Sequence, residues 1–226
     1  SNKFLVKSQS TNQRPTISRE QKIFKYKFRS KNSEKITMSN EKVKILGFAG
    51  SLRKGSYNKA LLKAAIELMP KNAELEIYEL DDIPPFNQDL ENDLPVKVKE
   101  FKEKIRKADA ILIATPEYNY SFSGVLKNAL DWASRPFGDN SLKGKPVAIM
   151  SASVGMFGGA RAQYHLRQVL LGLNMHPINR PEVIVPYADE KFDENGRLID
   201  QETREIVKSL LEALVNWTIK IKGSEI

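Results

Sequence analysis

The 226-residue sequence contains no cysteine. This absence excludes disulfide bonds, metal sites built on thiolates and a cysteine nucleophile. Histidine is scarce as well, since His165 and His176 are the only two. Two isolated histidines without a cysteine do not match the ligand pattern of a transition-metal site. We therefore expect no bound metal, and we interpret His165 as a local packing or capping residue of a helix.

The sequence also lacks an apolar run of about 18 residues, the length that crosses a bilayer. Its first residues are basic and contain no apolar segment, so they do not resemble a secretory signal. We expect no membrane partner and a cytoplasmic location. A chain of 226 residues is long enough for one well-buried domain and short for two.

Acidic residues are nearly missing from the first 37 positions. Residues 1–37 hold ten of the 36 Lys and Arg residues and two of the 28 Asp and Glu residues. Residues 38–226 therefore hold equal numbers of each sign, and the whole formal charge of +8 lies in the N-terminal arm. Because the remainder is neutral, it has no net attraction for polyanions, and we expect no nucleic-acid partner.

We expect the chain to divide into a basic arm, residues 1–40, and one folded domain, residues 41–226. Three interpretations of the arm stay open. It is polar enough to be disordered, and it is basic and nearly free of acidic residues, as transit-type segments are. It could also precede a natural start at Met38, since the pattern of a folded domain begins only at Val43.

From Val43 onward, short apolar segments alternate with amphipathic ones. This alternation predicts βαβ units around a parallel sheet. The expected strands are residues 43–48, 74–80, 110–115, 146–151 and 182–186, and the expected helices are residues 58–69, 95–108, 125–133, 161–173 and 203–220. Five strands in about 185 residues favour a flavodoxin-like α/β fold, a three-layer sandwich with a parallel sheet in the order 2-1-3-4-5.

Ligands of such sheets bind beyond the carboxyl ends of the strands, beside the point where the strand order reverses. The first loop that reaches this point is "GSLRKGSYN", residues 50–58. It matches neither the dinucleotide nor the Walker glycine pattern. It does offer hydroxyl and amide side chains, Arg53 and the N–H groups of a helix N-terminus, which together suit a phosphate monoester. The alternative is a helix capped by Ser56 or Asn58, with Arg53 in solvent.

Two further loops reach the same edge of the sheet. The loop "PEYNYSFSG", residues 116–124, carries three aromatic side chains on which a flat ring could rest; the alternative is a turn buried against a neighbouring subunit. The loop "SASVGMFGGA", residues 151–160, contains three glycines, which permit the backbone to approach the edge of a planar heterocycle; the alternative is a plain flexible loop. A monophosphate site with two ring-contacting loops predicts FMN.

Four motifs, "GSLRKGSYN", "TPEYNYS", "GVLKNALDW" and "SVGMFGGARAQYHLRQ", resemble in this order the NADPH-dependent FMN reductase family, especially its quinone and chromate reductases. The resemblance implies FMN held by the first loop, by Glu117 to Tyr120 and near Ser153. The cofactor-binding residues that we expect are Ser51, Leu52, Arg53, Lys54, Gly55, Ser56, Tyr57, Asn58, Pro116, Glu117, Tyr118, Asn119, Tyr120, Ser153, Gly155, Gly158 and Gly159.

The resemblance also implies an oxidoreductase in which NADPH or NADH reduces FMN, and FMN reduces a quinone, free flavin, an azo compound or chromate. No catalytic side chain is expected, and Glu117, which has no second acid to pair with, is expected to orient the cofactor or the nicotinamide. The sequence offers no second fingerprint for the donor's pyrophosphate, so we expect donor and acceptor to use one flavin face in turn, a ping-pong mechanism. The alternative is a non-enzymatic electron carrier of the flavodoxin type, which usually docks through an acidic face.

The same resemblance implies a homodimer or homotetramer. In this family "GVLKNALDW" lies at or near the subunit contact, so Lys127 and Trp132 are the expected interface residues. Phe122 and Ser123 stand where a proline before the glycine is common. This departure puts the specificity of the pocket for small-molecule acceptors in question.

Overall fold

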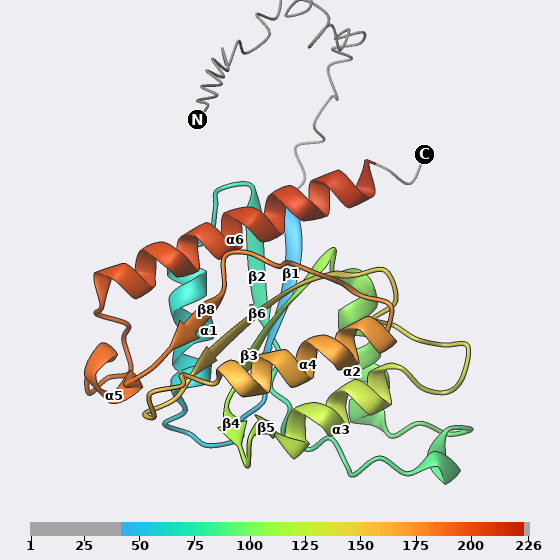
Figure 1. Ribbon diagram of the computed structural model, residues 1–226. Helices are drawn as coiled ribbons and strands as arrows, with labels where there is room; N and C mark the ends of the chain where they lie inside the picture. The colour runs from blue at the N-terminus through green and yellow to red at the C-terminus, as the bar shows by residue number, and fades with distance from the viewer. Residues whose placement is uncertain (1–41, 224–226) are drawn as a thin grey trace, which may run out of the picture. The chain divides into compact units, whose positions relative to one another are not determined.

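A computed structural model describes residues 42–223 of the protein (Figure 1). The predicted arm, residues 1–40, and the interpretations attached to it lie outside the described residues and stay predictions. None of the helices in the described range is both long and apolar enough to cross a membrane.

A parallel sheet forms the centre of the described part of the chain. Its strands are β1 (Val43–Ala49), β2 (Ala73–Ile77), β3 (Ala110–Thr115), β6 (Pro146–Ala152), β7 (His176–Pro177) and β8 (Val183–Val185). The order is β2-β1-β3-β6-β7, and β8 pairs with the end of β6. The predicted order 2-1-3-4-5 is confirmed, with the fifth position divided between two short strands: β7 pairs with the start of β6 and β8 with its end.

Helices cover both faces of this sheet. They are α1 (Tyr57–Glu67), α2 (Val96–Lys107), α3 (Gly124–Ala133), α4 (Ala160–Gly172), α5 (Ala188–Lys191) and α6 (Gln201–Lys222), with a 3₁₀ turn at Gln88–Leu90. Side chains of α1 and α6 belong to one buried apolar cluster, and side chains of α2, α3 and α4 belong to another. The protein is therefore the predicted three-layer sandwich. The five longer helices lie within two residues of their predicted bounds.

The central strands are apolar because both of their faces are covered. In β1, Ile45 belongs to the cluster under α1 and α6, and Leu46 belongs to the cluster on the other face. All six side chains of β3 are fully buried. Continuously apolar strands of this kind are what a parallel sheet between two helical layers requires. The predicted strand 74–80 ends earlier, at Ile77, where pairing with β1 stops.

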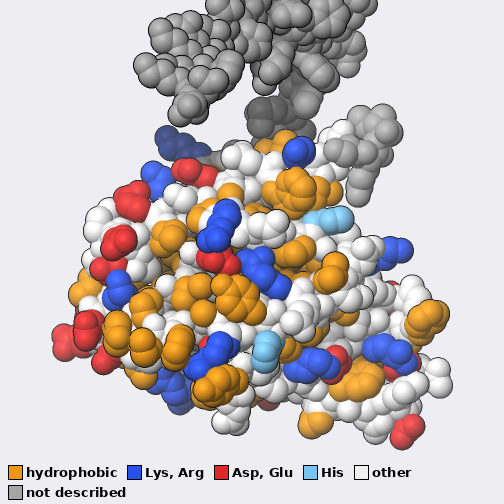
Figure 2. All heavy atoms as spheres, in the orientation of Figure 1, with side chains coloured by type: hydrophobic (Ala, Val, Ile, Leu, Met, Phe, Trp, Pro, Cys, Tyr) orange, Lys and Arg blue, Asp and Glu red, His pale blue; other side chains and the backbone are white. Residues whose placement is uncertain are grey.

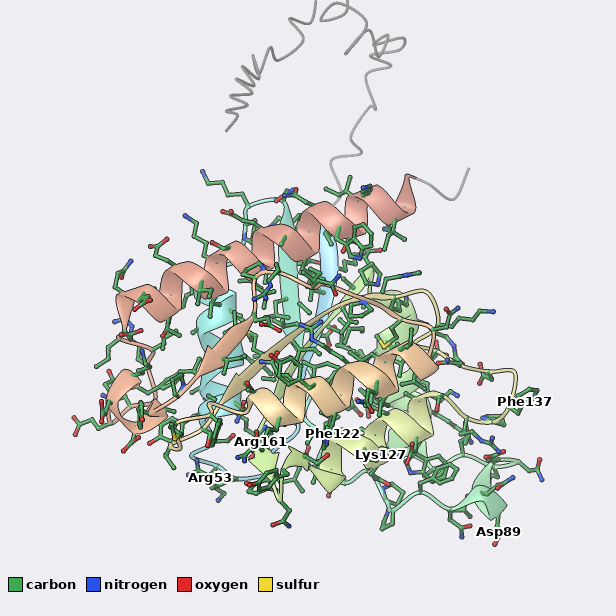
Figure 3. All side chains as sticks on the ribbon, in the orientation of Figure 1. Arg53, Asp89, Phe122, Lys127, Phe137 and Arg161 are labelled. Carbon is green, nitrogen blue, oxygen red and sulfur yellow. The ribbon has the colours of Figure 1, made fainter. Side chains whose placement is uncertain are left out.

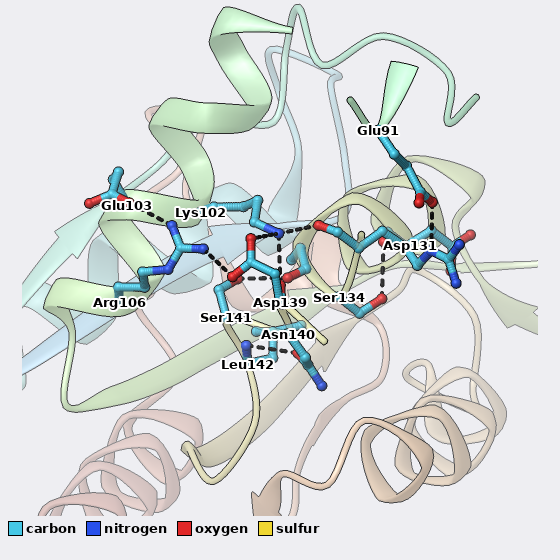
Figure 4. Close-up of polar contacts among 12 residues, drawn as sticks. Glu91, Lys102, Glu103, Arg106, Asp131, Ser134, Asp139, Asn140, Ser141 and Leu142 are labelled. Atoms are coloured by element: carbon cyan, nitrogen blue, oxygen red, sulfur yellow. Dashed lines mark hydrogen bonds and ion pairs between the residues drawn. The ribbon is translucent and has the colours of Figure 1, made fainter. Parts of the chain in front are cut away.

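A buried lysine anchors the loop between α3 and β6 (Figure 4). The Lys102 side chain is 1% exposed, and its Nζ donates to the carbonyl oxygens of Arg135 and Asp139 and lies 3.0 Å from the Asp139 carboxylate. Arg106 contacts the same carboxylate at 2.6 Å. Burial lowers the pKa of Lys102 below its ordinary value, although Asp139 opposes the shift. The loop is thereby fixed on both sides of Phe137, which is 93% exposed.

The N-terminus of α6 supplies a test of electrostatic stabilisation. Asp200 caps this helix by accepting from the Thr203 amide at 2.9 Å, and it pairs with Lys191 at 3.0 Å. Hydrogen bonds from the Thr203 and Lys191 side chains lower the pKa of Asp200 to about 2. A carboxyl with a lowered pKa stabilises the fold above its unfolded pKa, 3.8, and this contribution is lost as the pH falls towards 2.

We predict that Asp200→Asn lowers the free energy of unfolding at neutral pH, and that the difference from the wild type shrinks as the pH falls from 5 towards 3. Asparagine keeps the cap but loses the charge, so it isolates the ion pair. Urea denaturation of both proteins across this range measures the difference. A difference that does not change with pH would show that the Asp200 charge adds nothing to stability.

Candidate functional site

Three loops meet at the carboxyl edge of the sheet, and side chains tie them together. Asn58, in the first turn of α1, donates from Nδ2 to the carbonyl oxygen of Ala152 and accepts at Oδ1 from the Ala152 amide, both at 3.0 Å. Ser123, the N-cap of α3, donates to the carbonyl oxygen of Gly50 at 2.6 Å. These contacts hold the loops after β1, β3 and β6 in one place, as Figure 3 shows for Arg53, Phe122 and Arg161 along one edge.

The loop after β1 presents hydrogen-bond donors that the protein leaves unpaired. Among residues 42–223, Arg53 and Lys54 have no carboxylate partner, and the hydroxyl of Ser51, a residue only 5% exposed, has no hydrogen bond. The amides of Tyr57 and Asn58, at the start of α1, have no acceptor in the same range. Unpaired amides at a helix N-terminus beside two cations are what a phosphate monoester requires. The loop therefore fits the phosphate of FMN.

Some residues of this loop have structural roles that the sequence left open. Ser56 is the N-cap of α1 and accepts from the Lys59 amide at 3.5 Å. The side chain of Asn58 is fully engaged with Ala152, so only its backbone amide remains for a ligand. The guanidinium carbon of Arg53 lies over the Tyr57 ring, 5.6 Å from the ring centroid. The alternative of a capped helix is therefore confirmed, and phosphate binding by the donors that remain stays a prediction.

The loop after β3 forms a short antiparallel hairpin, β4 (Glu117–Tyr118) and β5 (Ser121–Phe122). Its two turn residues, Asn119 and Tyr120, have φ values of 48° and 68°. Such a pair of left-handed residues is the geometry of a tight hairpin turn whose twist matches its strands. Periodicity did not predict this hairpin, because two-residue strands are too short to show it. The turn exposes 67% of Tyr120 at the edge of the sheet.

Glu117 caps α4 from the hairpin. Its Oε2 accepts from the backbone amides of Arg161 at 3.1 Å and Ala162 at 3.3 Å, and its Oε1 accepts from Arg161 Nε at 2.5 Å. The Glu117 side chain is 7% exposed, so this carboxylate is both buried and paired. The helix N-terminus and the guanidinium stabilise its charge together. Glu117 therefore positions Arg161 and α4, a role that the sequence did not indicate.

Arg161 connects the second and third loops. Its guanidinium carbon lies 3.9 Å from the centroid of the Tyr120 ring and 4.3 Å from that of Phe157. With Glu117 and Ser153, these residues line a hollow of about 330 Å³. Figure 2 shows several hydrophobic side chains exposed on this face of the molecule. In the loop after β6, Val154, Met156 and Phe157 are each more than half exposed. The hollow therefore has aromatic walls and a fixed cation.

The three predicted glycines of the third loop divide into two kinds. Gly155 and Gly159 both line the hollow, and a Cβ on Gly155 would meet only the Ser153 hydroxyl, at 3.7 Å. Gly158 and Gly159 have φ values of 56° and 89°, and a Cβ on either would come within 2.8 Å of protein atoms. These two glycines are required by the turn into α4 and by packing against Ser151 and β8. The approach of a ligand is not needed to explain them.

Comparison with known proteins identifies the family. The model of the family described as NADPH-dependent FMN reductase matches residues 43–190. The chain belongs to this family. It is 50% identical over 185 residues to an NAD(P)H-dependent FMN reductase of Pseudomonas aeruginosa. This match covers 81% of this chain and 100% of that protein. It is 45% identical over 188 residues to an NAD(P)H:quinone oxidoreductase of Solanum tuberosum, covering 80% and 95%.

A solved structure supports the same assignment. A flavoenzyme NAD(P)H:(acceptor) oxidoreductase from Paracoccus denitrificans is 37% identical, with a TM-score of 0.73, and the match covers 78% of this chain and 97% of that one. This member of the NADPH-dependent FMN reductase family is therefore an oxidoreductase that uses FMN and NAD(P)H. The expected family, fold and cofactors are confirmed.

The expected subunit contact at Trp132 is wrong for this FMN reductase. The Trp132 side chain is fully buried within one chain, where its Nε1 donates to the carbonyl oxygen of Pro84 at 2.8 Å and its ring contacts Phe86. A large indole on an amphipathic helix has the same sequence pattern whether it faces its own core or a partner. Lys127 is exposed and pairs with Asp131 on the same helix at 2.7 Å. His165, on the exposed side of α4, contacts the Ser121 hydroxyl at 3.1 Å.

We predict that Arg53→Ala weakens FMN binding about tenfold to a hundredfold, the usual effect of losing a charge-assisted hydrogen bond to an anion. Riboflavin, which has no phosphate, should bind both proteins alike. Fluorescence titration of the apoprotein with each flavin measures the two constants. Lys63→Ala, on an exposed position of α1 outside the loop, is the control. An equal loss for both flavins would show that Arg53 shapes the loop and does not contact phosphate.

We also predict that Glu117→Ala lowers the free energy of unfolding of this protein by about 1–3 kcal/mol, because it leaves two helix amides and a guanidinium without their acceptor. Glu117→Gln retains one carbonyl oxygen as acceptor and should cost less. Urea denaturation of the flavin-free proteins measures both. If Ala and Gln were as stable as the wild type, the carboxylate would not be what holds α4 to the hairpin.

Proposed function

We propose that this enzyme transfers two electrons from NADPH or NADH, by way of FMN, to quinones. The observation that carries the proposal is that unpaired phosphate donors and a hollow with aromatic walls are tied to one edge of the sheet. The quinone oxidoreductase among its relatives, 45% identical, supports the choice of acceptor. Free flavin, azo compounds and chromate are further acceptors that we propose.

The residues fit FMN in a defined way. The backbone amides at Tyr57 and Asn58, the Ser51 hydroxyl and Arg53 are the donors for its phosphate. The second loop, residues 116–120, and the third loop at Ser153 and Gly155 would hold its ring. When bound, FMN supplies the redox chemistry, since it takes up a hydride from the nicotinamide and gives two electrons to the acceptor.

The side chains of the hollow contribute position and exclusion of water. Tyr120 and Phe157 supply apolar walls for a flat ring. Glu117, the carboxylate of the hollow, is held by three hydrogen bonds to Arg161 and Ala162. These hydrogen bonds commit the carboxylate to holding α4 and Arg161. We therefore assign no catalytic acid, base or nucleophile to the protein.

The flavodoxin-type carrier is the weaker alternative. A carrier exchanges electrons with partner proteins and needs no place for a nicotinamide. This chain belongs to a family of NAD(P)H-dependent enzymes, and residues 38–226 have no acidic excess with which to dock a redox protein. NADPH oxidation in the presence of a quinone separates the two functions, because a carrier alone supports almost none.

We propose that donor and acceptor occupy the hollow in turn. Hydride transfer requires the donor carbon to lie about 3–3.5 Å from its target. Both the nicotinamide and a flat quinone must therefore come directly against the same exposed ring. The flavin ring would fill part of this hollow, which is about 330 Å³, and the space that remains favours one further occupant at a time.

We predict parallel double-reciprocal lines when NADPH is varied at several fixed concentrations of 1,4-naphthoquinone, because the oxidised donor must leave before the acceptor binds. Initial rates of NADPH oxidation by the holoenzyme give the lines. The second measurement is a single turnover without quinone, in which one equivalent of NADPH should bleach the flavin fully. Intersecting lines would contradict the shared hollow, and a flavin that bleaches only when quinone is present would contradict a ping-pong sequence.

We further propose that the working unit is a homodimer or homotetramer. The outward face of α4 supports this, because Leu171 is 76% exposed and Tyr164 is 53% exposed beside the hollow-forming residue Arg161. Large apolar side chains exposed along one helix are typical of a surface that another protein covers. Lys127 remains available for such a contact, whereas Trp132 does not.

A further inference from the structure

A groove lies along the C-terminal half of α6, away from the hollow. It is bounded by this helix and by the segment that joins β7 to β8, which Figure 1 shows alongside α6. Its volume is about 430 Å³, within the range of small-molecule sites. The residues that line this α6 groove are Pro177, Ile178, Asn179, Arg180, Ala213, Asn216, Trp217 and Lys220.

The α6 groove is separate from the site assigned to FMN. Pro177 pairs with Val147 near the start of β6, whereas Ser153 of the hollow follows the end of the same strand. A parallel strand rises about 20 Å over six residues. The groove and the hollow share no lining residue. Bound FMN therefore does not fill the groove, and a ligand there does not compete with FMN.

A fixed indole forms one wall of the groove. Trp217 Nε1 donates to the carbonyl oxygen of His176 at 3.2 Å, which sets the orientation of the ring. Ala213 lies one turn earlier on the same face of α6, and its small side chain leaves room beside the indole. Trp217 is partly exposed. The wall therefore offers a flat apolar surface on which an aromatic ring can stack.

The segment opposite the indole is held on two sides. The Ile178 amide donates to the carbonyl oxygen of Val147 at 2.9 Å, and the Ile178 carbonyl oxygen accepts from Arg167 Nη1 at 2.8 Å. The sheet and α4 thus fix the position of this segment together. A site whose walls are in place before the ligand arrives loses little conformational entropy on binding.

The polar groups of the groove suit an anion. None of its eight lining residues is acidic, and Arg180 and Lys220 are basic. Arg180 pairs with Glu182 through Nη1 at 3.0 Å, and its other N–H groups have no hydrogen bond within the described part of the chain. The exposed amides of Asn179 and Asn216 likewise have no hydrogen bond to a described residue. Guanidinium and amide donors together suit a carboxylate.

We propose that the α6 groove is a second ligand site and that it binds a planar aromatic carboxylate. The ring stacks on Trp217, and the carboxylate accepts from Arg180 and the two asparagine amides. Both parts of the ligand are needed. An anion without a ring would meet only exposed donors, which contribute little in water, and a neutral ring would leave those donors unused. The site goes beyond the proposed function and does not depend on electron transfer.

The experiment titrates the FMN-loaded holoenzyme with 2-naphthoate by isothermal calorimetry. The matched ligand is 2-naphthamide, which has nearly the same shape and no charge. We expect 2-naphthoate to bind about tenfold more tightly than 2-naphthamide, with an affinity that falls as salt is added. No binding of 2-naphthoate, equal affinity for the two ligands, or an affinity that salt does not weaken would overturn the proposal.

Two variants locate the bound ligand. Arg180→Gln should weaken 2-naphthoate about threefold to tenfold and leave 2-naphthamide unchanged. Ala213→Leu, which keeps a good helix former and fills the space beside Trp217, should abolish the binding of both ligands. Lys208→Gln, at an exposed position of α6 outside the groove, is the control and should change neither.

Other sites and other occupants give different results. If 2-naphthoate binds Ala213→Leu as it binds the wild type, it lies elsewhere, for instance on the flavin, and the proposal fails. If either variant changes the oligomeric state in size-exclusion chromatography, the groove is a contact between copies of this chain, and the proposal fails as well. Should Ala213→Leu not fold, the comparison of the two ligands on the wild type and on Arg180→Gln decides.

Discussion

The burial of the central strands on both faces determines where this protein places its polar groups. The strands β1, β3 and β6 lie between two layers of helices, and nearly all of their side chains are excluded from water. An unpaired polar group there would cost several kcal/mol. Hydrogen-bonding and charged side chains are therefore confined to the ends of the strands. Because the strands are parallel, their carboxyl ends lie at one edge, and the three loops that carry chemistry meet there.

The N-termini of α1 and α4 both lie at this edge, and their amides have different partners. The N-terminus of α4 receives the Glu117 carboxylate from its own chain. Within residues 42–223, the N-terminus of α1 keeps amides without an acceptor, beside Arg53 and Lys54, which have no carboxylate partner there. This difference supports the proposal that an anionic ligand binds at α1, where no carboxylate of the described residues competes. The reciprocal bonds between Asn58 and Ala152 join this phosphate loop to the hollow, so one ligand can use both parts.

Local patterns in the sequence predicted the strands and helices because apolar periodicity records burial directly. Most residues that line the hollow were expected at the site, but the contacts among them could not be predicted in the same way. Glu117 contacts an amide 44 residues later in the chain, and nothing in either segment alone marks that pairing. The glycines Gly158 and Gly159 were expected beside a ligand, yet contacts with Ser151 and β8 suffice to require them. Trp132 was expected at a partner, yet Pro84 and Phe86 cover it. Each of these roles depends on which segments the fold brings together.

The labelling rate of the buried Lys102 amine can report how often the loop that it anchors opens. Reagents that modify amines attack the neutral form, and burial favours that form in Lys102, yet the same burial keeps reagents away. Surface lysines therefore react at once, whereas Lys102 reacts only while the loop that it anchors is open. The rate at which this single amine becomes labelled is then the rate of local opening multiplied by the chance of capture. The side chain that anchors the loop between α3 and β6 is therefore also a probe of the local opening of that loop.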